Sequence, residues 1–176
     1  LYNLSGNDKS ILGLERTIFL FCMTMGSILG GPLGVHINKK NLMTISEAVR
    51  IPMVIMLLFI QNIPAILMIN GFVAFFTGIY NPSRQAIINE IVPEADIKSA
   101  NSLFGSTMAI LHLFGPVLGA ALFTFFNSIN QIVIIDALSF LAGVLFLVSM
   151  QYRSPHKKEN NGHFLQDLKD GISYVK

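Results

Sequence analysis

The chain has 176 residues, of which 52% are apolar and only 12% are charged, and its mean hydropathy is +0.59. A charged fraction about half that of a soluble domain excludes a disordered chain and makes an ordinary soluble enzyme a poor fit. The net charge of +2 includes no basic block long enough for a nucleic-acid patch, and the single cysteine, Cys22, can form no disulfide within the chain. These properties favour a membrane protein.

Long uncharged stretches predict the membrane-spanning helices, because a helix needs about 20 mostly apolar residues to cross a bilayer. Two stretches, 51–83 and 99–135, are too long for one span, and a polar break divides each of them, at 61–64 and at 127–130. We therefore expect an all-α, polytopic helix bundle with five spans. They are expected near Thr17–Val35, Leu42–Ile60, from the first break to about Tyr80, Leu103–Phe126 and Ile132–Met150.

The lysines and arginines between these spans predict the orientation, because basic loops stay in the cytoplasm. One side of the membrane has only Lys9 and Arg16. The other side has the remaining basic residues of the alternate loops and of the tail: Lys39, Lys40, Arg84, Lys98, Arg153, Lys157, Lys158, Lys169 and Lys176. We expect a multi-pass protein of the cell membrane with these loops and the C-terminal tail in the cytoplasm. The chain then starts outside, so we expect at least one helix before it.

The tail differs from the rest of the chain. A polar linker at 153–162 is followed by apolar residues at helical spacing, namely Phe164, Leu165, Leu168, Ile172 and Val175. This pattern predicts an amphipathic helix that lies on the membrane surface or leads into another span. A tail without regular structure is the alternative.

The loop predicted after the first span, 31–40, resembles the signature G-x-x-x-D-R-x-G-R-R of the major facilitator superfamily. Gly31 matches the first glycine, and Lys39 and Lys40 match the closing basic pair. The chain departs from the signature where Asp, Arg and Gly are replaced by Val35, His36 and Asn38.

Four further segments resemble the drug- and macrolide-efflux branch or the proton antiporters of this superfamily, and they occur in the family's order. They are 81–103 for the loop between the fourth and fifth helices, 115–119 for the end of a glycine–proline motif, 136–140 in the sixth helix and 164–172 in the central linker. The resemblance implies that 1–150 is the transmembrane part of an N-terminal six-helix lobe without its first helix, and that 151–176 is a cytoplasmic linker.

The resemblance also implies a function. A twelve-helix transporter of this type works by alternating access between two six-helix lobes. The branch implies efflux of amphipathic, macrolide- or drug-like molecules from a bacterial cell, by an antiporter that is driven by the proton gradient and needs no cofactor. The expected partners are the lipid bilayer, a small-molecule substrate and the C-terminal lobe of the same chain, missing here, with no nucleic acid.

Charged and polar residues inside predicted spans are the candidates for transport, because such residues are costly in a bilayer and often functional. Asp136 is a candidate proton or substrate-cation site, and a helix-pairing hydrogen bond is its alternative. Glu47 and Arg50 share a helix face and form either a static ion pair or one that exchanges partners. His112 is either a pore residue or a packing residue.

Two further groups of candidates follow from the motifs. Proline removes a backbone hydrogen bond, so Gly115, Pro116 and Gly119 predict a helix kink. Gly26, Gly30 and Gly34 recur at four-residue spacing and predict a close helix contact, either a sliding surface or static packing. The residues of the expected cytoplasmic gate are Gly31, His36, Lys39, Lys40 and Arg84.

The sequence therefore favours a secondary active transporter, not an enzyme. Its four histidines are scattered and suggest no metal site, and no phosphate-binding loop is present to suggest an ATP-driven pump. The alternative is a non-transporting or degenerate half-sized membrane protein. Its best support is Val35, which replaces the aspartate of the signature.

Overall fold

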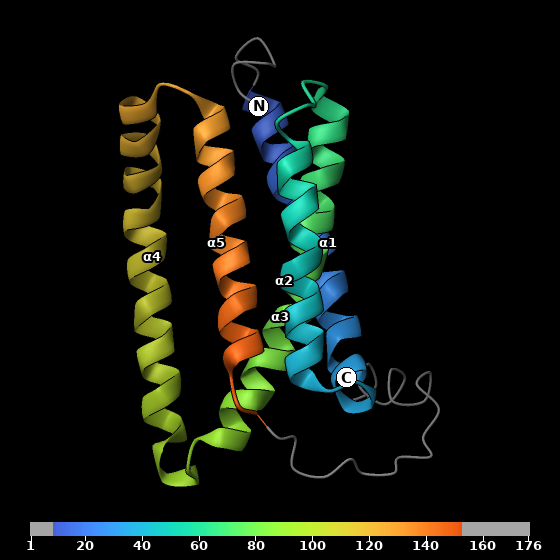
Figure 1. Cartoon of the computed structure of the whole chain (residues 1–176), viewed down its shortest axis with the longest axis vertical. Helices are drawn as coiled ribbons and strands as arrows, with labels where there is room; N and C mark the ends of the chain where they lie inside the picture. The colour runs from blue at the N-terminus through green and yellow to red at the C-terminus, as the bar shows by residue number, and fades with distance from the viewer. Residues whose placement is uncertain (1–8, 153–176) are drawn as a thin grey trace.

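The computed structural model describes residues 9–152, which form a bundle of helices that run up and down in chain order (Figure 1). The helices are α1 (Lys9–His36), α2 (Lys39–Met56), α3 (Ile63–Ile91), α4 (Ile97–Phe126) and α5 (Ile129–Ser149), with a short 3-10 turn, η1 (Glu94–Asp96), before α4. The amphipathic helix predicted near the C-terminus and the linker before it lie outside the described residues.

Five α-helices lie within residues 9–152, as expected for this part of the chain. Of these, α1, α3, α4 with η1, and α5 are long and apolar enough to cross a membrane. The exception is α2, which has 18 residues and includes Lys39, Lys40, Glu47 and Arg50. The prediction of five helices is therefore confirmed within residues 9–152, whereas only four of them are candidate spans. α2 packs against α3 and α5.

The predicted breaks at 61–64 and 127–130 do separate helices, whereas the connection predicted after Tyr80 is largely helical, which corrects that expectation. α3 continues beyond Tyr80 and through Pro82 to Ile91. A proline in a helix leaves the carbonyl group four residues earlier without its usual partner. Here that carbonyl belongs to Gly78, and it accepts a hydrogen bond from the Ser27 hydroxyl on α1 at 3.2 Å. A contact from another helix therefore satisfies the backbone where the sequence predicted an end.

Glycines bring α1 and α3 into close contact. A Cβ atom added to Gly26 would lie 2.0 Å from the carbonyl oxygen of Phe75, and one added to Gly78 would lie 2.1 Å from that of Met23. At Gly30 it would lie 2.9 Å from a backbone atom of α3. No side chain larger than hydrogen fits at these distances. The predicted close contact is confirmed at Gly26 and Gly30, and α3 contributes Gly78 to it.

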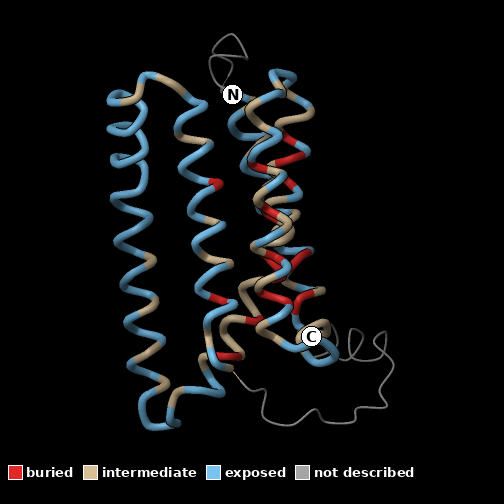
Figure 2. Tube along the Cα trace, in the orientation of Figure 1, coloured by how far each residue is buried: buried red, intermediate tan, exposed pale blue. Residues whose placement is uncertain are grey.

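Most buried residues lie on α2 and α3, and α4 has none (Figure 2). A buried apolar cluster forms near the start of α2 and the ends of α3 and α5. It consists of Met43, Ile87 and Leu147. α4 instead exposes large apolar side chains along its length, with Leu103 and Leu113 about 70% exposed. Such a surface suits contact with lipid or with other protein rather than with water.

One end of the bundle is richer in basic residues than the other. α1, α3 and α5 all finish at this end, and α2 and α4 begin there (Figure 1). Lys39 and Lys40 at the start of α2 and Lys98 at the start of α4 therefore lie at the same end, which we call the basic end. Arg16, by contrast, lies in the first half of α1, toward the other end. The predicted alternation of basic connections is present in the fold.

The glycine contact predicts the effect of a small substitution on stability. Gly78→Ala places a methyl group against the backbone of α1, so the two helices must separate, and we expect a loss of about 1–3 kcal/mol in the free energy of unfolding. Thermal denaturation of the purified full-length protein in detergent measures this loss. Gly31→Ala is the control, because its methyl group meets nothing within 4 Å. Equal melting temperatures for the two variants would contradict the account.

Candidate transport site

Arg50 on α2 is the most deeply buried charged side chain in the described part of the chain, with 6% of its surface exposed. Its Nη2 atom lies 2.6 Å from Oε1 of Glu47, one turn earlier on the same helix. Burying one charge alone is costly, and a close partner offsets much of that cost. The ion pair predicted from the spacing of these two residues is therefore present.

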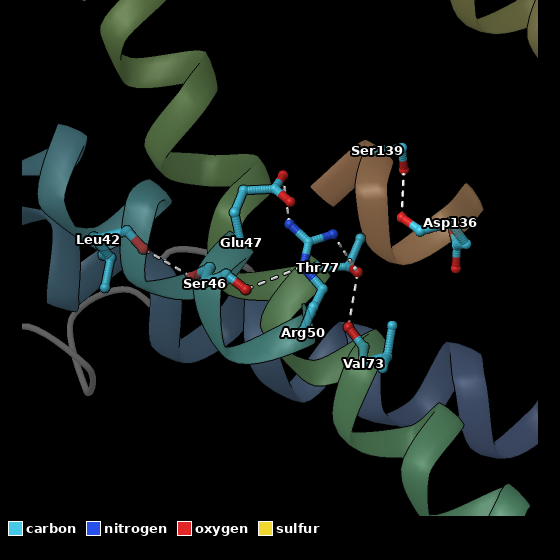
Figure 3. Close-up of polar contacts among 8 residues, drawn as sticks. All are labelled: Leu42, Ser46, Glu47, Arg50, Val73, Thr77, Asp136 and Ser139. Carbon is cyan, nitrogen blue, oxygen red and sulfur yellow. Dashed lines mark hydrogen bonds and ion pairs between the residues drawn. The ribbon is translucent and has the colours of Figure 1, made fainter. Parts of the chain in front are cut away.

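The other donors of Arg50 bind α2 and α3 (Figure 3). Nε donates to the carbonyl group of Ser46 at 3.1 Å, and Nη1 donates to the hydroxyl of Thr77 at 3.4 Å. The Thr77 hydroxyl in turn donates to the carbonyl group of Val73 at 2.8 Å. Arg50 thus connects α2 to a polar position on α3.

Aromatic rings on two helices complete the surroundings of Arg50. Its Cζ atom lies 4.7 Å from the centre of the Phe140 ring on α5 and 5.4 Å from that of Tyr80 on α3. Rings at these distances attract a cation through their negative faces. Gly143 on α5 lies beside the Glu47 carboxylate, and a Cβ atom there would be 3.8 Å from Oε2. The Glu47–Arg50 pair therefore lies where α2, α3 and α5 meet.

Asp136 is one turn before Phe140 on α5 and is exposed in the described part of the chain. The Phe140 ring faces Arg50, and the attraction between Asp136 and Arg50 is weaker than that between Glu47 and Arg50. No hydrogen bond or ion pair reaches the Asp136 carboxylate from residues 9–152. Ser139, the nearby serine, donates instead to the backbone carbonyl group of Asp136, at 2.7 Å (Figure 3). The helix-pairing hydrogen bond considered for this carboxylate is therefore not formed within the described residues.

A second polar cluster lies at the basic end. Lys39 Nζ lies 2.7 Å from Oε1 of Glu90, near the end of α3. The Tyr152 hydroxyl, just beyond α5, donates to the other carboxylate oxygen of Glu90. One carboxylate on α3 therefore connects the start of α2 with the segment that follows α5.

Lys40, the other basic residue of the signature, binds the end of α5. Its Nζ atom donates to the carbonyl groups of Val148 at 2.9 Å and Met150 at 2.7 Å. The last carbonyl groups of a helix lack partners within the helix, so a lysine placed there stabilises the end of α5.

The segment that departs from the family signature caps the next helix. Asn38, which stands where the family has glycine, caps α2, because its Oδ1 accepts a hydrogen bond from the backbone N–H of Lys40 at 3.0 Å. Val35 and His36, in the last turn of α1, are exposed. Asparagine is a favoured residue before the first turn of a helix, so sequence alone could have identified this cap. Neither this cap nor the contacts of Glu90 with Lys39 and Tyr152 were predicted from the sequence.

The remaining candidates lie apart from both clusters. Arg84 on α3 is near the basic end, but it does not join Lys39 and Lys40. Its Cζ atom lies 3.9 Å from the centre of the Phe104 ring on α4. Gly31 borders open space, since a Cβ atom there meets nothing within 4 Å.

His112 is exposed on α4 and makes no hydrogen bond or ion pair within residues 9–152. Gly115, Pro116 and Gly119 are exposed on the same helix, which continues without a break through Pro116. The kink expected there stays a prediction. These four residues of α4 therefore lie outside both the Glu47–Arg50 pair and the polar cluster at the basic end.

Comparison with known proteins identifies the family. The sequence profile of the Major Facilitator Superfamily matches residues 3–172, nearly the whole chain. The chain belongs to the major facilitator superfamily. Its members are transporters rather than enzymes, which agrees with a multi-pass helical bundle and a charged cluster inside it. Membership of this superfamily implies a multi-pass protein embedded in the lipid bilayer.

Several bacterial relatives are recognisable. The chain is 23% identical over 171 residues to the "Uncharacterized MFS-type transporter YfiS" of Bacillus subtilis, covering 93% of this chain and 41% of that protein. It is 31% identical over 108 residues to the "Putative bacilysin exporter BacE" of Bacillus amyloliquefaciens, covering 60% of this chain and 26% of that protein. The chain thus spans less than half the length of these relatives. No solved structure matches it significantly.

The buried ion pair predicts a particular pattern of stabilities. Arg50→Gln leaves the Glu47 charge without its partner, so we expect a loss of about 3–5 kcal/mol in the free energy of unfolding. The double variant Glu47→Gln/Arg50→Gln removes both charges and should lose less. Thermal or denaturant unfolding of the full-length protein measures these differences.

Arg16→Gln is the control for the loss of one arginine, because Arg16 is exposed on α1. The free energy of unfolding of this variant should be close to that of the wild type. A double variant at least as unstable as Arg50→Gln would show that the pair does not stabilise the bundle in the way described.

Proposed function

We propose that the full-length protein is a proton-coupled exporter of amphipathic small molecules from a bacterial cell. The observation that carries the proposal is Asp136, an exposed carboxylate on the most apolar candidate span, one turn from the Phe140 ring that contacts the buried Arg50. A carboxylate at such a position is a functional candidate by its cost alone.

The arrangement supports a simple form of coupling. A charged Asp136 competes with Glu47 for the single guanidinium of Arg50, whereas a protonated Asp136 leaves Arg50 to Glu47. Arg50 also binds Thr77 on α3 and faces Phe140 on α5, so a change in its position alters its contacts with both helices. A proton on Asp136 therefore biases the packing of three helices. A transporter couples a proton to alternating access when the bound proton favours one of its two conformations over the other.

The orientation and direction of transport rest on charge and on relatives. Basic connections favour the cytoplasmic side, so the basic end is placed in the cytoplasm. In this proposal residues 1–150 belong to the N-terminal lobe and 151–176 to the linker that leads to the second lobe. Export is supported by the similarity to BacE, which is named a putative bacilysin exporter. Macrolide- or drug-like substrates are supported by the resemblance of the motifs to the drug- and macrolide-efflux branch.

Replacement of Asp136 tests the proposed coupling. In everted membrane vesicles that contain the full-length protein, Asp136→Asn should reduce proton-driven uptake of a fluorescent amphipathic dye to below about a tenth of the wild-type rate. The remaining uptake should no longer vary with pH. The reason is that an amide cannot bind and release a proton.

Ser139→Ala is the matched control, since Ser139 lies less than one turn away and binds only a backbone carbonyl group. It should transport normally. Wild-type rates and pH dependence in Asp136→Asn would remove Asp136 from the mechanism. If a broad dye panel is transported no faster with the protein than without it, the proposal of export itself fails.

A further inference from the structure

The chain does not leave the bundle directly at the end of α5, because residues 150–152 lie against its basic end. Met150 and Tyr152 are partly buried, and both pack against the buried apolar cluster that α2, α3 and α5 form together. Removing these side chains from water favours a fixed position for the segment.

The backbone of this segment is bound to the start of α2. The Nζ atom of Lys40 donates to the carbonyl groups of Val148 at 2.9 Å and Met150 at 2.7 Å. The carbonyl group of Met150 also accepts a hydrogen bond of 3.1 Å from the backbone N–H of Tyr152. One lysine on α2 therefore binds the chain on both sides of the residue that ends α5.

A side chain of the segment is bound to the end of α3. The Tyr152 hydroxyl donates to the carboxylate of Glu90, and the other oxygen of this carboxylate lies 2.7 Å from Nζ of Lys39. A hydrogen bond to a charged acceptor is stronger than one between neutral groups. The segment is thus attached at two separate points, once through its backbone and once through a side chain.

We propose that residues 150–152 form a strap that fixes the point where the chain leaves the bundle. The strap joins the end of α5 to the start of α2 and to the end of α3, and it holds these three helix ends together. Lys39 and Lys40, which the sequence predicted in a cytoplasmic gate, both contribute to it. The inference goes beyond the proposed function, because the contacts that carry it involve no transported molecule.

Trypsin tests the strap, because Arg153 follows it directly in the sequence. A protease holds several residues on each side of the bond that it cuts, so cleavage after Arg153 requires the strap to detach. The cleavage rate then follows the population of the locally opened state. The experiment uses the purified full-length protein in detergent, and mass spectrometry measures the fragment that begins at Ser154.

Two variants should release the strap. Tyr152→Phe removes the hydroxyl that binds Glu90 and keeps the ring that packs against the apolar cluster. We expect cleavage after Arg153 to become about tenfold faster, as for the loss of one hydrogen bond to a charged group. Lys40→Met removes the contacts with two carbonyl groups and should also accelerate this cleavage.

Two controls separate release of the strap from a general loosening of the bundle. Tyr80→Phe also removes a tyrosine hydroxyl, but one that makes no hydrogen bond within residues 9–152, so cleavage after Arg153 should keep the wild-type rate. Cleavage after Lys98, which is exposed at the start of α4, should have the same rate in every variant.

Equal rates of cleavage after Arg153 in the wild type and in Tyr152→Phe would overturn the inference. An acceleration of the same size in Tyr80→Phe, or after Lys98, would overturn it as well, because the bundle as a whole would then be loosened. The result is independent of transport. A protein that exports nothing but shows the expected cleavage pattern keeps the strap and loses the proposed function, and an exporter without this pattern loses the strap alone.

Discussion

The structure depends on how one buried cation, Arg50, is neutralised inside an apolar bundle. Removing a charge from water costs several kcal/mol unless partners replace the water. Arg50 finds them on three helices: Glu47 on its own helix α2, Thr77 on α3 and the Phe140 ring on α5. The charges that make α2 too polar to count as a candidate span are thus among those that bind it to its neighbours. Asp136 adds a second carboxylate within electrostatic reach of the same cation.

The other helix contacts follow different physical rules. α1 and α3 meet through glycines whose missing side chains let the two backbones touch. At the basic end, Lys39 and Lys40 attach the start of α2 to the ends of α3 and α5. Val35, which stands where the family signature has aspartate, is exposed and contributes nothing polar to this attachment.

Much of this arrangement follows from local pattern, and the remainder depends on which helices face each other. Run lengths predict the five helices, four-residue spacing predicts the contacts of Gly26 and Gly30, and three-residue spacing predicts the Glu47–Arg50 pair. The continuation of α3 past Pro82 was missed because Ser27, far away in sequence, satisfies the Gly78 carbonyl group. Glu90 as the partner of Lys39 and Phe104 as the partner of Arg84 were missed for the same reason.

The most direct test of the central claim is to count protons released when substrate binds. Purified full-length protein in weakly buffered detergent is mixed with the dye that gives the fastest uptake in the vesicle assay. A pH indicator in the solution measures the protons released. Release is expected from the wild type and from Ser139→Ala, and none from Asp136→Asn, because the proposed coupling assigns the released proton to the Asp136 carboxylate. Equal release from Asp136→Asn and the wild type would contradict the account.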